Sequence, residues 1–430
     1  MRTLITFCMI IMATVFVVVG VIKDANSDAT LDLSSGLCVI ASQGDMVKSA
    51  MSKNKILFSA DDFERALNIA EVSSITLTSV PSATDGCLCV GDVLVNAGQT
   101  VSGDNLSLLN FRAANDKIKE SAFKFKVNGG EYEITCRMYL LDRENSAPTL
   151  SMEDEKTFSV STHQSVRIYG KVGAYDPDGD DLRYEVVTYA KNGVLDFNNK
   201  TGEYSYLPSG AYFGSDYFEY VALDEYGNYS RSGRVNLNIE KINTDVVYCD
   251  MQEHKYHHAA ISMTEMNVMN GATIGESTYF MPDKSVSRID FVVMLMNTIG
   301  EKSTLGVYDT GFDDDSEIPQ SMKGYVHRAR EIGIPVGLVN ENGEYLMRPS
   351  EYISRSEAAL MVSALIENEV PTVKPTFADK NDIPAWASDA VYSLNSKGIL
   401  ESENGRISPN APLTRAQLAQ MLYNLANLIK

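Results

Sequence analysis

A motif that occurs three times in the C-terminal part of this 430-residue chain constrains its fold most. Each copy has a hydrophobic residue, any residue and a proline, and an arginine follows six positions after the proline. The copies are Phe280–Pro282 with Arg288, Met347–Pro349 with Arg355, and Ile407–Pro409 with Arg415. A long-period repeat indicates units that are too small to bury a core alone, so we expect the three units to pack on one another.

Each repeated arginine is predicted to lie in the first turn of a helix. The residue before it can act as an N-cap, because a hydroxyl accepts from the free N–H groups of the first turn. These caps are Ser287, Ser354 and Thr414. A second helix is expected upstream, after an aromatic-x-Asp turn that ends at Asp250, Asp314 or Asp379. Each unit is therefore predicted to run turn, helix, loop, helix.

These motifs resemble the S-layer homology (SLH) family, whose pattern runs from Phe-x-Asp through Trp-Ala and Gly-Ile to Phe-x-Pro and Thr-Arg-Ala-Glu. The third copy matches this pattern best, with Phe377–Asp379, Trp386–Ala387, Gly398–Leu400, Pro409 and Thr414–Ala416. The resemblance covers about residues 245–430, with repeats at 245–301, 308–368 and 373–430. It implies an all-α unit in which three repeats surround a central three-helix bundle.

The resemblance also implies a ligand, a cell-wall polysaccharide that typically carries pyruvylated sugars and binds in grooves between repeats. The arginines would engage the pyruvyl carboxylate, which suits a planar guanidinium at a helix N-terminus. The aspartates would accept from sugar hydroxyls, and an aromatic face would stack on a sugar ring. The implied binding residues are Arg288, Arg355, Arg415, Asp250, Asp314, Asp379 and Trp386.

Structural roles remain open for the same residues. An arginine in a first helical turn is often solvated or ion-paired, and an aspartate after an aromatic residue is usually a turn or cap residue. Trp386 has only Tyr256 as an approximate counterpart in the first repeat, and Ser321 lies near that place in the second. The three grooves are therefore not expected to be equal.

The amino end predicts export. Thr3–Ile22 is a nearly unbroken apolar run after Arg2, and small and polar residues follow to Ala29. This pattern is typical of a secretory signal peptide over residues 1–29. The run is also long enough to span a bilayer, so an uncleaved anchor is the alternative. A formal net charge of −20 argues against nucleic-acid binding and leaves local arginines to attract an acidic glycan.

Residues 144–241 alternate apolar and polar positions, with turn signals every 8–12 residues, which is the rhythm of a β-sandwich. They resemble the cadherin-like, immunoglobulin-like modules of bacterial surface proteins. Four acids in this segment, Asp176, Asp178, Asp180 and Asp224, raise a calcium hypothesis, because Ca²⁺ takes six to eight oxygen ligands. The alternative is that Asp-Pro-Asp-Gly is simply a favoured turn sequence.

Residues 30–143 predict a second immunoglobulin-like β module, with strands near Ser74–Thr78, Phe123–Val127 and Tyr132–Tyr139. Asp61–Ala70 is expected to form either a short helix or an irregular strand crossing. Four cysteines fall in this segment: Cys38, Cys87, Cys89 and Cys136. Cys87 and Cys89 would face one side of a strand. Buried core thiols, a disulfide and a zinc site all remain open.

No nucleophile elbow, phosphate loop or dinucleotide fingerprint occurs in the chain. His254, His257 and His258 lie near Glu253 without the zincin order. We therefore expect a secreted, non-catalytic surface protein of a Gram-positive-type bacterium, anchored without a covalent bond to wall polysaccharide, with the β modules as spacer or contact surface. The alternatives are an adhesin whose β modules bind a host or cell-surface ligand, and a wall hydrolase with an active site in residues 30–143. The sequence does not decide whether the protein forms an S-layer lattice.

Overall fold

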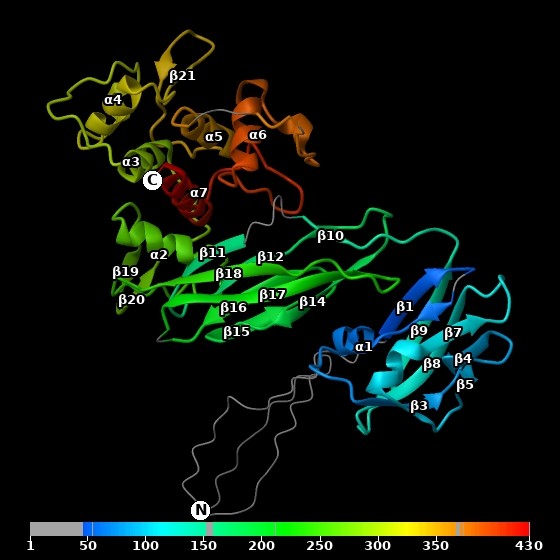
Figure 1. Cartoon of the computed structure of the whole chain (residues 1–430). Coiled ribbons are helices and arrows are strands. Elements are labelled where there is room, and N and C mark those ends of the chain that lie inside the picture. The colour runs from blue at the N-terminus through cyan, green and yellow to red at the C-terminus, as the bar shows by residue number, and fades with distance from the viewer. Residues whose placement is uncertain are drawn as a thin grey trace, which may run out of the picture.

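The computed structural model describes residues 46–53, 55–151, 158–210, 212–366, 370–372 and 374–429. Two β modules and a helical region follow one another along the chain (Figure 1). The predicted leader over residues 1–29 and Cys38 lie outside the described residues. Within the described ranges, no helix combines the length and the apolar character that a membrane crossing needs.

The first β module has two sheets around an aromatic core. One sheet has the order β1-β9-β8-β3-β6 and the other β2-β7-β4-β5. The strands are β1 (Met46–Met51), β2 (Ile56–Leu57), β3 (Ser74–Ser79), β4 (Gly86–Val90), β5 (Val93–Leu94), β6 (Thr100–Ser102), β7 (Leu109–Ala113), β8 (Glu120–Val127) and β9 (Ile134–Leu141). The short helix α1 (Ala60–Leu67) begins at the cap Ser59 and buries Phe63 against Phe125. β1 runs parallel to β9, and the other pairs of its sheet are antiparallel.

The second β module pairs a four-stranded sheet, β11-β18-β17-β14, with a three-stranded sheet, β12-β16-β15. A two-stranded pair, β10-β13, lies at one end. The strands are β10 (Thr149–Leu150), β11 (Phe158–His163), β12 (Ile168–Lys171), β13 (Ala174–Tyr175), β14 (Leu182–Thr188), β15 (Gly193–Phe197), β16 (Glu203–Pro208), β17 (Gly214–Asp224) and β18 (Gly233–Glu240). Alternating positions of these strands, such as Tyr204 and Tyr206 on β16, fill the core between the sheets. This confirms the predicted β-sandwich with alternating apolar and polar positions.

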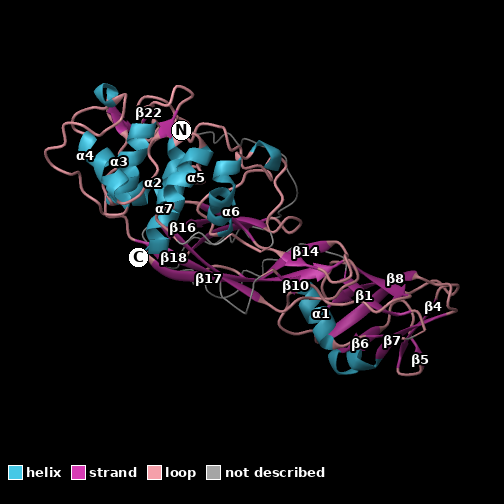
Figure 2. Cartoon of the chain, turned by 90° about the horizontal axis from the view of Figure 1, so that it is seen from above, coloured by secondary structure: helices cyan, strands magenta, loops and turns pink. Residues whose placement is uncertain are grey.

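The helical region has six α-helices, which pack in pairs among the described residues (Figure 2). The helices are α2 (His257–Glu265), α3 (Arg288–Thr298), α4 (Lys323–Glu331), α5 (Arg355–Ser363), α6 (Ser388–Ser396) and α7 (Arg415–Ile429). Helix α4 packs on α3, α6 packs on α5, and α2 packs on α7. The first helix of each sequence unit therefore lies on the second helix of another unit, and one continuous core joins all three.

The starts of α3, α5 and α7 meet in a closed set of backbone hydrogen bonds. Val286 donates to Leu413, Leu413 donates to Ile353, and Ile353 donates to Val286, at 2.9–3.0 Å between N and O. The predicted caps are confirmed: Ser287 and Ser354 accept from the N–H groups of Asp290 and Glu357, and Thr414 accepts from Gln417. Local capping thus starts each helix, and the cyclic bonds bring the three starts together.

A buried histidine pair joins the second β module to the helical region. The Nδ1 atoms of His163, at the end of β11, and His258, on α2, lie 2.8 Å apart. His258 Nε2 lies 2.8 Å from the hydroxyl of Tyr423 on α7. Because only one Nδ1 can carry the proton between the rings, this geometry requires both histidines to be neutral or to share a single charge.

Candidate functional site

Arg288 is turned away from solvent and into the second sequence unit. Its side chain is 1% exposed. Nε donates to the carbonyl of Met347 at 2.8 Å and Nη2 to the carbonyl of Val336 at 3.0 Å. Nη1 lies 2.7 Å from Glu357 Oε1. Burial lowers the pKa of this guanidinium, and Glu357 opposes that shift.

Arg355 and Arg415 repeat this arrangement on the next units. Arg355 is 5% exposed, and it donates through Nε to the carbonyl of Ile407 at 2.6 Å and through Nη2 to that of Glu401. Arg415 is only half-buried. It donates to the carbonyls of Phe280 at 2.8 Å and Asn270 at 2.9 Å, and its guanidinium carbon lies 4.8 Å from the Phe280 ring centroid.

The three arginines therefore form a cycle. Each one binds the backbone of another unit at the hydrophobic residue of the repeated motif: Met347, Ile407 or Phe280. A guanidinium presents its donors in a fixed fork, so it can fasten two carbonyls of a neighbouring loop at once. In this arrangement the arginines hold the three units together. Arg415 is the most solvent-exposed of the three.

The three predicted aspartates bind the backbone of the same motif. Each carboxylate accepts from two successive N–H groups before the proline, at 2.6–3.0 Å. The acceptors are Asp250, Asp314 and Asp379. The second donor residue has positive φ although it is not glycine, at Met281, Arg348 and Ser408. Two charge-assisted hydrogen bonds can hold this strained turn. Burial alone would raise the pKa of Asp379, but the N–H donors of Ile407 and Ser408 outweigh it and the pKa is lowered.

Trp386 is the predicted binding residue with the most open surface. Its side chain is 53% exposed in the short 3-10 helix η4 (Ala385–Ala387). Its approximate counterpart Tyr256 is buried and donates its hydroxyl to Glu401 Oε2 at 2.7 Å. The structure thus gives the two aromatic residues different surroundings, in line with the predicted inequality of the units.

Three of the four predicted calcium ligands lie together at the start of the second β module. Carboxylate oxygens of Asp176, Asp180 and Asp224 lie within 4.8 Å of one another. Asp178 is engaged elsewhere: it accepts from the N–H of Ser146 at 2.7 Å, and this lowers its pKa. The sequence had not singled out Asn145 as a ligand, yet its Nδ2 donates to Asp224 at 2.6 Å.

The chemistry of this cluster fits a hard cation. Within the part of the chain that the structure describes, three buried oxygens here have no hydrogen-bond partner: Asn145 Oδ1, Asp176 Oδ2 and Asp180 Oδ2. Asp180 is 6% exposed, and burial raises its pKa although Arg143 pairs with it. Unpartnered buried oxygens cost free energy, and an oxygen-seeking divalent ion would satisfy several of them at once.

Cys87 and Cys89 are separate thiols. Their Sγ atoms lie 3.8 Å apart on β4, on one side of the strand as the spacing predicted. Cys136 is buried on β9. Burial raises the pKa of Cys89. Within the described ranges the cysteines form no group with metal-ligand geometry.

Comparison with protein families identifies two domains. Residues 145–238 match the bacterial Ig domain, and residues 376–419 match the S-layer homology domain. The chain therefore carries an SLH domain with an immunoglobulin-like module upstream, and neither of the two domain families is catalytic. An SLH domain implies association with the cell surface or cell wall. No curated protein sequence matches the chain significantly.

Similarity to solved structures is distant. An endo-fucoidan hydrolase of glycoside hydrolase family 107 is 16% identical, with a TM-score of 0.19, over 40% of this chain and 24% of its own. Drosophila N-cadherin EC1-3 is 10% identical, with a TM-score of 0.22, over 46% of this chain and 64% of its own. The chain thus spans about a quarter of the hydrolase and less than two thirds of this cadherin fragment. These values carry no argument about function.

Proposed function

We propose that this protein is exported and held without a covalent bond to a secondary cell-wall polysaccharide by residues 245–430. The SLH domain at 376–419 is the observation that carries the proposal. The β modules would stand away from the wall as spacer or contact surface, and the predicted leader would direct export. The Ig-like domain upstream fits either of the two roles.

The proposal includes three SLH repeats, at 245–301, 308–368 and 373–430, around the helices α3, α5 and α7. It is supported by the equivalent bonds of the three units. Each unit has an aspartate on two N–H groups, a motif carbonyl bound by an arginine, and one member of the backbone cycle. Three independent helical hairpins would have no reason to share these contacts.

The proposed ligand is an acidic, pyruvylated polymer. Within the predicted set we place Trp386 and Arg415 foremost, because the tryptophan is exposed and the arginine is only half-buried. A tryptophan face can stack on a sugar, and a guanidinium can bind its carboxylate. The remaining five, Arg288, Arg355, Asp250, Asp314 and Asp379, would act by shaping the grooves, since their polar atoms bind the backbone.

A sedimentation assay tests the anchoring. The mature chain from residue 30 is mixed with purified wall sacculi before and after acid removal of the secondary polymer. We expect pelleting only with intact sacculi, and a tenfold or greater loss of affinity for Trp386→Ala. Tyr308→Ala removes another exposed aromatic ring and serves as the matched control. Equal pelleting on stripped sacculi would refute the polymer as ligand.

We also propose a Ca²⁺ site formed by Asn145, Asp176, Asp180 and Asp224, next to the connection between the two β modules. Its support is the group of buried oxygens for which the described residues provide no hydrogen-bond partner. Terbium luminescence sensitised by nearby tyrosines should titrate in the wild type and in Asp178→Asn, and should be lost in Asp224→Asn. Equal signals from the two variants would contradict the site.

The adhesin and hydrolase alternatives make different predictions for the same protein. An adhesin would bind cells or matrix through the β modules, and binding would persist when wall anchoring is lost. A hydrolase would release soluble sugar from sacculi. Incubation of the mature chain with both materials separates the three functions.

A further inference from the structure

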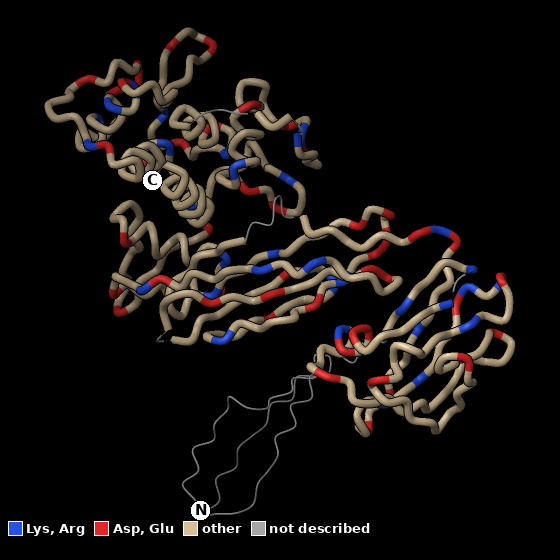
Figure 3. The backbone as a smooth tube through the Cα atoms, viewed as in Figure 1, with Lys and Arg blue, Asp and Glu red and all other residues tan. Residues whose placement is uncertain are grey.

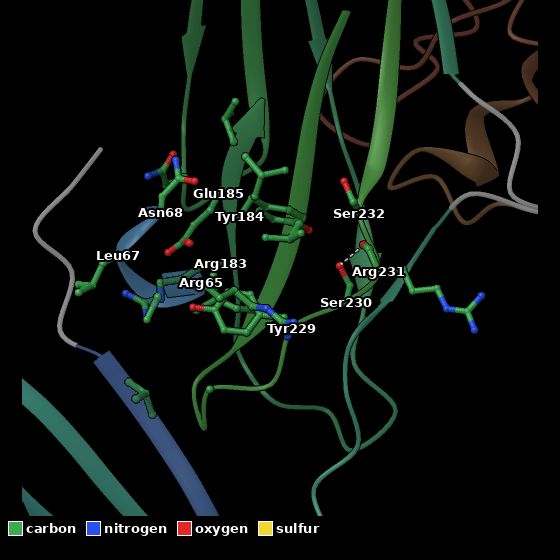
Figure 4. Close-up of a pocket in the computed structure, with 18 of the residues that line it drawn as sticks. Arg65, Leu67, Asn68, Arg183, Tyr184, Glu185, Tyr229, Ser230, Arg231 and Ser232 are labelled. Carbon is green, nitrogen blue, oxygen red and sulfur yellow. Dashed lines mark hydrogen bonds between the residues drawn. The ribbon is translucent and has the colours of Figure 1, made fainter. Parts of the chain in front are cut away.

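A cavity of about 570 Å³ lies between the first β module and the outer face of the second (Figure 4). Its wall includes the end of α1, with Arg65 and Asn68, and the outward positions Arg183 and Glu185 of β14. Tyr229 joins them from the segment after β17. The volume lies in the range of pockets that enclose small ligands, about 300–1,000 Å³.

Three arginines line the cavity: Arg65, Arg183 and Arg231. The side chain of Arg231 points away from the other two in Figure 4, so two guanidinium groups face the cavity. Among the described residues, no carboxylate lies within 4.0 Å of Arg65 or Arg183. Residues of both charges are interspersed along the chain (Figure 3), and many of its other arginines are paired. Arg65 lies over the Tyr229 ring, 5.7 Å from its centroid. The two arginines are 118 positions apart in the sequence, and only the approach of the two modules brings them to one cavity.

The carboxylate of Glu185 offsets part of the positive charge of the cavity. Its carboxylate is mostly buried, and burial raises its pKa while Arg183 opposes the shift. The described residues give it no hydrogen-bond donor. Two guanidinium groups and one carboxylate leave a net charge of about +1, which matches a ligand with one negative charge and disfavours a polyanion such as a nucleotide.

We infer that this cavity binds a sugar with a single carboxylate per ring, such as a uronic acid. The guanidinium groups of Arg65 and Arg183 would bind the carboxylate, and Glu185 would accept from ring hydroxyls. Tyr189, which lines the same cavity and is partly exposed, offers an aromatic face of the kind on which sugars stack. This site is separate from the SLH region, and it makes the β modules a contact surface rather than only a spacer.

Calorimetric titration of the mature chain with galacturonate tests this inference. Its methyl ester provides the matched ligand, because the sugar is retained and the charge is removed. We expect binding of galacturonate and at least tenfold weaker binding of the ester. Arg183→Gln and Arg65→Gln should each weaken binding about 10- to 100-fold, the range of one charge-assisted contact. Both side chains are exposed, so the variants should fold, which far-UV circular dichroism checks.

Lys200→Gln is the control, since it removes an exposed positive charge that does not line the cavity. It should leave the affinity within twofold. The site is refuted if the acid and the ester bind equally, if Lys200→Gln weakens binding as much as Arg183→Gln, or if no heat is detected at 10 mM ligand (roughly the weak end of useful affinities). Wall pelleting depends on the helical region, so this result and that of the sedimentation assay are independent.

Discussion

The helical region and the β modules use their charged side chains in opposite ways. In the helical region, the repeated arginines and aspartates bind backbone carbonyl and N–H groups, and each of them fastens a loop. Near the connection of the β modules, the described residues give buried oxygens of Asp176 and Asp180 no hydrogen-bond partner, and they place no carboxylate within 4.0 Å of Arg65 or Arg183. Residues that recur in a sequence repeat can therefore have a structural role, whereas polar groups that lack a protein partner indicate a ligand site.

The strongest test of this contrast is Arg288→Ala. The change leaves two buried carbonyls and Glu357 without their donor, which should destabilise the helical region by about 3–5 kcal/mol. Arg415→Ala should cost about 1.5–3 kcal/mol, because this guanidinium is half-buried and binds backbone carbonyls, with no carboxylate among the described residues within 4.0 Å. Urea unfolding followed at 222 nm measures both, since most helix lies in this region. No loss of stability in either variant would mean that the arginines do not hold the units together.

The aspartates make the next largest prediction. Asp379→Ala removes the acceptor of the N–H groups of Ile407 and Ser408, and should cost about 1.5–3 kcal/mol. Asp382→Ala, an exposed acid in the same loop, is the control and should change the unfolding free energy by less than about 0.5 kcal/mol. If wall binding were lost in Asp379→Ala while the urea midpoint stayed constant, this carboxylate would contact the polymer instead.

The sequence predicted the local part of this network and missed its partners. Ser287 and Ser354 could be identified as caps because the N–H groups that donate to them lie only three residues away. Arg415 donates to the carbonyl of Phe280, 135 positions earlier. Every residue has a backbone carbonyl, so the sequence does not show which one accepts this hydrogen bond. Positive φ at Met281 was equally hidden, because glycine is the residue that normally marks it.

The calcium cluster shows the same limit. Asp176, Asp178 and Asp180 occupy alternate positions of one short segment, so they were predicted as one set. In the folded turn, however, Asp178 accepts a hydrogen bond from the N–H group of Ser146. Asn145 joins the cluster through Asp224, 79 positions away. No short-range pattern connects these two residues.

The histidine pair between the two regions predicts a pH dependence. Burial, with further effects of His163 and His257, lowers the pKa of His258 to about 3 from an ordinary value of 6.5. The folded state therefore binds fewer protons than the unfolded state. Its stability should be complete above pH 6.5 and should fall toward pH 3 by about 1.4 kcal/mol per pH unit. Burial also lowers the pKa of His257, which acts in the same direction.

Unfolding midpoints between pH 7 and pH 5 measure this slope. Glu240, Glu265 and Tyr423 also face the pair, so the test needs a variant. His258→Gln should reduce the slope, and His327→Gln, at a partly exposed position of α4, should leave it unchanged. An unaltered slope in His258→Gln would assign the pH dependence to other groups.

The smallest expected change in stability concerns the acidic cluster of the second β module. Asp180→Asn in the presence of a chelator should leave the urea midpoint of the protein unchanged or raise it, although it removes an ion-pair partner of Arg143. The reason is that burial raises the pKa of Asp180, so keeping this carboxyl ionised costs free energy in the folded protein when no cation is bound. With 1 mM Ca²⁺ (about the level at which extracellular calcium modules bind) the same variant should be less stable than the wild type. If the variant is at least as stable as the wild type without calcium and less stable with it, the carboxylate serves to bind the ion. A loss of stability under both conditions would place Asp180 with Asp379, among the acids that only hold the fold.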